Sequence, residues 1–275
     1  FSGFYFKKGA PVVAEQKRLS PARLARRYGR WLLPVSILLM LGLWQLLSAP
    51  GGLPAFILPS PVQFATRFIQ VLVDGSLLRH LSVTLMEVLV GLAAGVSSAT
   101  FIGYLLAKSR LLEKLVAPYL VASQAVPIVA IAPLLVIWFG PGLFSKMLVC
   151  ALIVFFPVLV NTVVGLRAVP ENLRDVMRAM RATPPQMLRH LEIPAALPVL
   201  LGGLRIGATL SVIGAVVGEF VASNRGLGFL INVGRGQYDT ALVFVAIFAL
   251  ICLALSLYGL VVLLEKRLLA WQQRP

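Results

Sequence analysis

The sequence predicts an all-α protein of the polytopic membrane class, with six transmembrane helices. Of its 275 residues, 59% are hydrophobic and 13% are charged, and the mean hydropathy is +0.91. A soluble domain carries about a quarter charged residues. The apolar residues fall in blocks that approach the roughly 20 residues a helix needs to cross the hydrocarbon. They lack the residue-by-residue alternation of a membrane β-barrel, so the solvent of most of this chain is lipid.

Six stretches fit the length of a membrane span approximately. The first is short and carries Pro34, which a helix tolerates near its start. The second is interrupted by Glu87 and by glycines, of which Gly91 and Gly95 form a small-xxx-small pair that favours close helix contact. In chain order the predicted spans are Trp31–Ser48, Leu81–Ala107, Leu115–Phe139, Met147–Leu166, Ala195–Ala222 and Ala241–Leu264.

The basic residues predict the orientation of these spans. Segments on the side of the two termini carry nineteen Lys and Arg residues, and the opposite connections carry five. Because cytoplasmic connections are enriched in Lys and Arg, we expect both termini in the cytoplasm. The predicted organisation is a basic tail at 1–30, a six-helix domain at 31–268 and a short tail at 269–275. This placement also explains the net charge of +15 without a nucleic-acid partner.

Two segments outside the spans have helical patterns. Residues 60–78, on the predicted outer side, form an amphipathic pattern that begins at Pro61. On the cytoplasmic side, the loop 169–194 predicts two short helices. The first follows the pair Pro170–Glu171, which suits a first helical turn. The second follows a capping-box pattern and is expected to end at Pro194.

An apolar stripe in the first of these helices needs something to cover it. Its members are Leu173, Val176, Met177 and Met180, which recur at helical spacing. Thr183 and Gln186 flank two prolines in the capping-box pattern that begins the second helix. The stripe is expected to pack either on the chain's own bundle or on a partner.

The same loop resembles a known family. The run LRDVMRAMRATPPQMLRHLEIPAALP at 173–198 resembles the EAA loop of ATP-binding-cassette (ABC) importer permeases. Asp175 occupies the acidic position of that motif, Val176 and Met177 replace its two alanines, and Arg181 replaces its glycine. A positive φ at this position would cost arginine roughly 1 kcal/mol relative to glycine. Either the turn is right-handed here, or Arg181 makes a compensating contact with the ATPase.

Further segments are similar to the nitrate/sulfonate/taurine-type branch of this family. The run AVPIVAIAPLLVIWFG at 125–140 is similar to the third span of the branch. VVGE at 216–219 and RGLG at 225–228 resemble its fifth span and the outer loop that follows. The resemblance covers roughly residues 30–265 and implies the type I ABC importer permease fold.

The resemblance implies a multi-pass permease subunit in the bacterial cytoplasmic (inner) membrane. Two permease chains, expected as a homodimer, would form a pathway by alternating access and dock a cytoplasmic ABC ATPase dimer. A periplasmic or lipid-anchored binding protein would deliver the solute. The sequence has no GxxxxGK[ST] phosphate loop, so ATP and Mg are expected on the ATPase, and no catalytic residue or cofactor is expected here. The expected ATPase-coupling residues are Asp175, Val176, Met177, Met180, Arg181, Thr183, Gln186 and Leu188.

Four residues within spans are candidates for the solute pathway. Glu87 and Glu219 are ionisable groups at membrane depth, where charge is costly, and either solute contact or a structural role explains them. Pro127 and Pro133 would either break the third span beside a cavity or only kink a packing helix. Arg205 is expected to snorkel or to find a partner near the end of its span.

The sequence constrains the solute only weakly. The expected mid-span charges are acidic and no mid-span cation is expected, which favours a heterocycle such as a thiamine precursor or riboflavin. Nitrate, sulfonate or taurine is the alternative. Other classes fit less well. A rhomboid-type protease would need an intramembrane Ser/His pair, but His80 and His190 lie outside the span interiors, and a secondary transporter usually shows an internal repeat. Neither cysteine has the spacing of a metal site.

Overall fold

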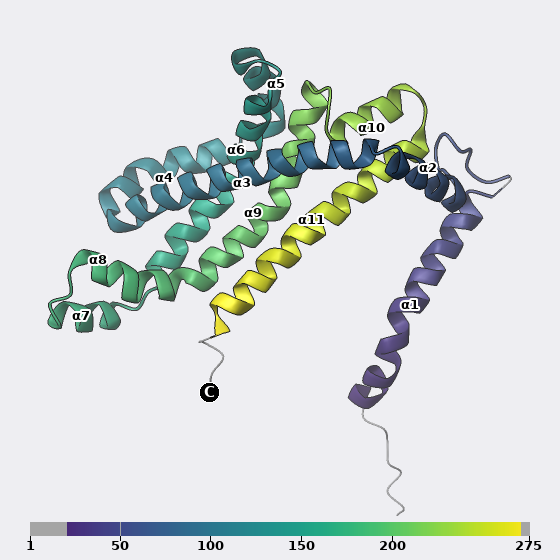
Figure 1. The fold of residues 1–275 in the computed structure, drawn as a ribbon. Coiled ribbons are helices and arrows are strands. Elements are labelled where there is room, and N and C mark those ends of the chain that lie inside the picture. Colours follow the sequence, from purple (N-terminus) through teal and green to yellow (C-terminus); the bar gives the residue numbers. More distant parts are fainter. Residues whose placement is uncertain (1–20, 50, 271–275) are drawn as a thin grey trace, which may run out of the picture. The chain divides into compact units, whose positions relative to one another are not determined.

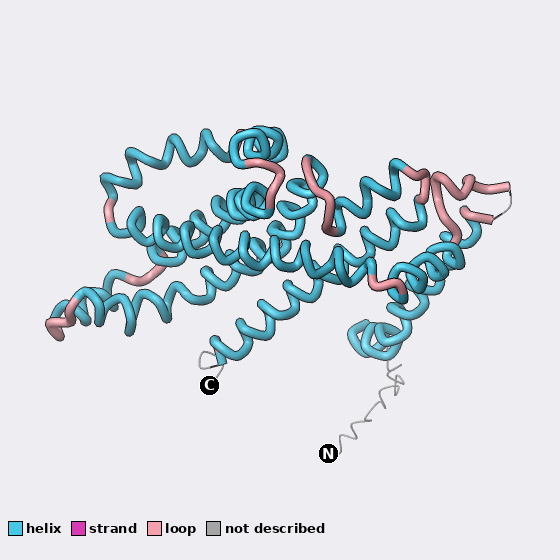
Figure 2. Tube along the Cα trace, turned by 45° about the horizontal axis from the view of Figure 1, so that its top comes forward, coloured by secondary structure: helices cyan, strands magenta, loops and turns pink. Residues whose placement is uncertain are grey.

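The structure is a computed structural model that describes residues 21–49 and 51–270, and every regular element in these ranges is a helix (Figure 2). The chain divides into two compact units, one ending at Leu53 and one beginning at Pro54. Most of the predicted tail at 1–30 lies outside the described residues.

The first unit contains α1 (Pro21–Leu47), with Pro34 inside the helix. Leu38, Leu39 and Leu46 are about 70% exposed within the unit, as expected for a helix that meets lipid or another protein surface. The side chains of α1 are described only from Pro34 onward, and Pro34–Leu47 is predominantly apolar. The first span therefore stays a prediction.

The second unit contains the remaining helices (Figure 1). In chain order they are α2 (Pro61–Val73), α3 (Ser76–Lys108), α4 (Arg110–Gln124), α5 (Ile128–Phe139), α6 (Leu143–Arg167), α7 (Glu171–Ala179), α8 (Pro184–Met187), the π-helix η1 (Leu188–Glu192), α9 (Ile193–Val221), α10 (Leu227–Gly236) and α11 (Thr240–Leu268). Helices α3, α6 and α11 and the continuous run Pro184–Val221 are long and apolar enough to cross a membrane. Helices α4 and α5 would add a fifth span if they act as one broken span. Four of the six predicted spans thus appear as single long helices.

The predicted amphipathic helix at 60–78 is shorter than expected. It ends at Val73 because Gly75 adopts a left-handed φ of 73° and breaks the helical path. The Asp74 carboxylate then accepts a hydrogen bond from the Ser76 amide at 2.8 Å, which helps α3 to begin before the predicted start at Leu81. At the other end of α2, Ser60 and Gln63 form a capping box.

The predicted third span, Leu115–Phe139, is interrupted, which matches the alternative that Pro127 breaks it. Helices α4 and α5 lie at 93° to one another. Pro127 has no amide hydrogen and disfavours a helical conformation at Val126, so the helix stops before Pro127 and a new one begins after it. Pro133, in contrast, lies inside α5 without ending it.

Helix α6 packs closely along both α3 and α9. A Cβ atom at Gly95 of α3 would lie 2.8 Å from the carbonyl oxygen of Ala151. From α9, a Cβ atom at Gly214 would lie 2.7 Å from the Cα atom of Cys150. The predicted close helix contact at Gly91 and Gly95 is therefore confirmed, and α6 is held between two glycine-bearing faces. Figure 1 places α7 and α8 at one end of this unit, called here the α7 end, and α10 towards the other, the α10 end.

Candidate functional site

The loop at the α7 end presents an apolar face that the chain itself leaves uncovered. Leu173, Val176 and Met180 are 44%, 56% and 73% exposed. Met177, which the sequence places in the same stripe, is half-buried. The exposed face of α7 is thus formed by Leu173, Val176 and Met180, and Met177 is turned towards the protein.

Helix α7 ends in a left-handed turn at Arg181, whose φ is 55°. The Ala182 amide donates to the Met177 carbonyl at 3.0 Å, and the Arg181 amide donates to the Arg178 carbonyl at 2.9 Å. These two bonds form a Schellman motif, in which glycine is the preferred residue at the left-handed position. The alternative of a right-handed turn is therefore wrong, and the Arg181 side chain makes no polar contact within the described residues.

The expectation that Pro194 ends the second loop helix is also wrong. The run α8–η1–α9 continues from Pro184 to Val221. A proline inside an α-helix clashes with the carbonyl four residues earlier. Here a wider π-helical turn precedes it, with the Ile193 amide donating to the Leu188 carbonyl, and this turn accommodates Pro194. The start of the run matches expectation, because the Thr183 amide donates to Gln186 Oε1 at 2.8 Å.

Polar contacts fasten this loop to the ends of the long helices. The Arg174 guanidinium donates to the Leu166 carbonyl at the end of α6, at 2.7 Å. Lys108, at the end of α3, pairs with the buried Glu192 of η1 at 2.6 Å. Asp175, at the acidic position of the motif, pairs with Arg178 at 2.8 Å on the surface of α7. The loop is therefore attached to α3, α6 and α9 together.

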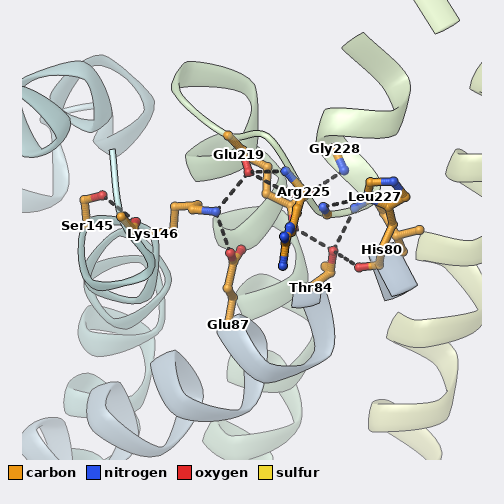
Figure 3. A network of polar contacts seen from close by, with 12 residues as sticks. His80, Thr84, Glu87, Ser145, Lys146, Glu219, Arg225, Leu227 and Gly228 are labelled. Atoms are coloured by element: carbon orange, nitrogen blue, oxygen red, sulfur yellow. Dashed lines mark hydrogen bonds and ion pairs between the residues drawn. The ribbon is translucent and has the colours of Figure 1, made fainter. Parts of the chain in front are cut away.

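A buried ionic network lies towards the α10 end (Figure 3). Glu87 of α3 pairs with Lys146 of α6 at 2.7 Å, and their side chains are 0% and 5% exposed. Lys146 also donates to Ser223 Oγ, at 2.9 Å, in the loop after α9. Lys146 is thus a buried cation in the first turn of α6, near the start of this predicted span. The sequence predicts Lys146 in an outer connection, whereas α6 begins at Leu143 and the Lys146 side chain is buried.

Glu219 of α9 joins the same network from the other side. Its carboxylate accepts hydrogen bonds from Thr84 Oγ1, at 2.6 Å, and from the Gly228 amide. Thr84 in turn accepts from the Leu227 amide at 2.8 Å. Gly226 has a φ of 113°, and a Cβ atom there would collide with the Glu219 carboxylate. The glycines of the loop after α9 are thus required by the close approach of this carboxylate.

The network joins α3, α6 and α9 and fixes the loop that leads into α10. The Gly226 amide donates to His80 Nδ1 at 3.0 Å, which adds a further attachment to α3. Glu87 and Glu219 are 0% and 1% exposed. Both are buried in this conformation, so the observed contacts are structural, and solute contact stays a prediction.

The other predicted pathway residues lie apart from this network. Pro127 is at the break between α4 and α5, and Pro133 is one and a half turns further along α5. The expected partner of Arg205 is found, because its guanidinium pairs with Glu265 and lies 5.6 Å from the ring centroid of Tyr258. Residues 21–49 and 51–270 contain no group of three or more His, Cys, Asp or Glu that could hold a metal ion.

Comparison with known proteins identifies the family. Residues 99–270 match the model of the binding-protein-dependent transport system inner membrane component. The chain belongs to this family. It is thus a permease subunit of an ABC importer and a multi-pass protein of the inner membrane, as the resemblance of its loop predicted.

Curated members of the permease family align with nearly the whole chain. The riboflavin transport system permease protein RibX of Chloroflexus aurantiacus is 50% identical over 87% of this chain and 90% of its own length. The formylaminopyrimidine transport permease protein ThiX of Halalkalibacterium halodurans is 36% identical over 86% of this chain and 94% of its own. The putative aliphatic sulfonates transport permease protein SsuC of Bacillus subtilis is 34% identical over 94% and 93%.

Proposed function

We propose that this permease moves a solute by alternating access and couples to a separate ATPase through residues 171–191. In this proposal two copies form the pathway, each with six spans and both termini in the cytoplasm. A binding protein delivers the solute at the α10 end, and ATP and Mg are bound by the ATPase at the α7 end. The expected coupling residues retain their assigned roles, except that Met177 supports α7 from inside.

The main observation that supports this proposal is the exposed apolar face of α7. Leu173, Val176 and Met180 project from a helix that lies beyond the long spans. Burying such a face in a partner's groove stabilises a complex by roughly 25 cal/mol per Å². Arg174 connects α7 to the end of α6, and the pair of Lys108 with Glu192 connects the following η1–α9 run to α3, so a displacement of the loop would be transmitted to the long helices.

We propose that the solute is a heterocycle of the riboflavin or thiamine-precursor type. The riboflavin and formylaminopyrimidine permeases are the relatives of higher identity, and sulfonate, nitrate or taurine is the alternative. The buried Lys146 does not favour an anion, because Glu87 neutralises it and Glu219 lies beside them. The ammonium group of Lys146 is therefore already paired and does not attract an anionic solute.

Substitution of Val176 by glutamate tests the coupling. A charge at the centre of the exposed α7 face should abolish co-purification of the ATPase from native membranes and the ATPase activity stimulated by the binding protein. Val62→Glu is the matched control, because Val62 is 69% exposed on α2, away from the α7 end. If Val176→Glu still retains a fully stimulated ATPase, coupling through α7 is refuted.

A further inference from the structure

A cavity of about 360 Å³ lies where α4 and α5 meet the middle of α6. Ser123 and Val126 line it from the end of α4 and the break, and Ile128 lines it from the start of α5. Phe156, Val160 and Asn161 line it from α6. The cavity therefore sits beside the only sharp bend of a candidate span among the described residues.

The bend leaves backbone groups without partners at this depth. Within the described residues, the carbonyls of Ala125 and Val126 and the amide of Val129 have no hydrogen-bond partner. Non-helical backbone at membrane depth is tolerated only where protein covers it or where it lines a water-filled cavity. The break thus supplies polar groups next to the cavity that lipid tails cannot satisfy.

The side chains of the cavity combine apolar walls with a few neutral polar groups. Asn161 donates from Nδ2 to the Pro157 carbonyl at 2.8 Å, while its Oδ1 has no partner among the described residues. Ser123 donates to the Leu120 carbonyl at 2.9 Å, which leaves its oxygen able to accept. Phe156 adds an aromatic ring, and no charged side chain lines the cavity.

We propose that this cavity is a solute subsite of the pathway and takes a neutral, planar heteroaromatic molecule. This proposal rests on the transport function proposed above and adds the place where the solute binds. The volume falls within the range of small-molecule sites, about 300–1,000 Å³, and an aromatic ring favours a planar ligand. An anion would find no counter-charge there, because no charged side chain lines the cavity. A lipid tail would fill the space but leave the backbone groups of the break unpaired.

Cysteine substitution of Val160 tests the subsite with little risk to folding, because Val160 is 45% exposed. Val164→Cys is the matched control, one turn further along α6, 53% exposed and outside the cavity lining. Both are made with Cys252→Ala, since Cys252 is an exposed thiol. Reaction with N-ethylmaleimide should lower ATP-driven riboflavin uptake at least fivefold in Val160→Cys. Riboflavin should slow that reaction, and Val164→Cys should show neither effect.

A second variant tests the polar recognition. Asn161→Leu should lower the riboflavin taken up per ATP hydrolysed by about tenfold, whereas stimulation of the ATPase by the binding protein stays at the wild-type level. Equal protection of both cysteines, or unchanged uptake in Asn161→Leu, would overturn the subsite while the transport function stands. Wild-type complex in liposomes that takes up no solute with ATP would overturn the proposed function itself, and the subsite with it.

Discussion

At the scale of single residues, the pairing of Lys146 with Glu87 governs the buried network. An unpaired charge at membrane depth is expensive, and the two side chains are almost fully buried. Replacing one partner of such a pair commonly costs about 3–5 kcal/mol, because the other charge is left uncompensated. Here the carboxyl group of Glu219 lies beside Glu87, so loss of the ammonium group also leaves two acidic groups together.

We expect Lys146→Met to lower the apparent melting temperature of the purified permease strongly. The double variant Glu87→Gln with Lys146→Met should recover most of that loss, because it removes both charges and keeps an amide beside Glu219. Thermal unfolding in detergent, followed by intrinsic fluorescence, measures both. A double variant no more stable than Lys146→Met alone would show that this ion pair does not govern stability.

At the scale of single elements, helix α7 ends in a left-handed turn that favours glycine but contains an arginine. The left-handed position of the Schellman motif is held by Arg181, which makes no polar contact within the described residues. The family motif has glycine there. An L-residue in this conformation costs roughly 1 kcal/mol more than glycine, and no polar contact of Arg181 among the described residues offsets that cost.

Arg181→Gly should therefore stabilise the end of α7. About 1 kcal/mol corresponds to roughly fivefold slower hydrogen exchange of the Ala182 amide, which closes the motif. Arg181→Ala is the control, since it removes the charge but keeps the steric cost, and it should not slow exchange. If both variants slow exchange equally, the charge of Arg181 and not its backbone geometry weakens the turn.

The elements also show which sequence patterns are decisive on their own. The apolar stretches at 147–166 and 241–264 lie within α6 and α11, because long apolar runs have only helical solutions in lipid. The presence of a proline, in contrast, did not predict whether a helix breaks. Pro127 ends a helix, Pro133 lies inside one, and Pro194 follows a π-turn within a continuous run. Whether a proline breaks a helix depends on whether its neighbours relieve the clash and the missing hydrogen bond, which a sequence does not display.

At the scale of the whole molecule, the proposed orientation places the α7 end in the cytoplasm and the α10 end outside. In a background lacking both native cysteines, Tyr238→Cys should react with a membrane-impermeant maleimide on intact cells, since Tyr238 is 84% exposed beyond α10. Asn172→Cys, exposed at the start of α7, should react only after permeabilisation. The reverse pattern would contradict the orientation predicted from the basic residues.

Composition and one short run of residues are enough to establish that this chain is helical, that it belongs in a membrane and which family it joins. These properties follow from local composition and from the short run at 173–198. Both can be read without knowledge of long-range contacts. Tertiary structure alone decided that Lys146 meets Glu87 from 59 positions away and that Glu219 approaches the glycines of the following loop. It also decided which part of the α7 stripe remains exposed. Such facts depend on how three helices pack against one another, and the burial of a charge is set by its neighbours in space.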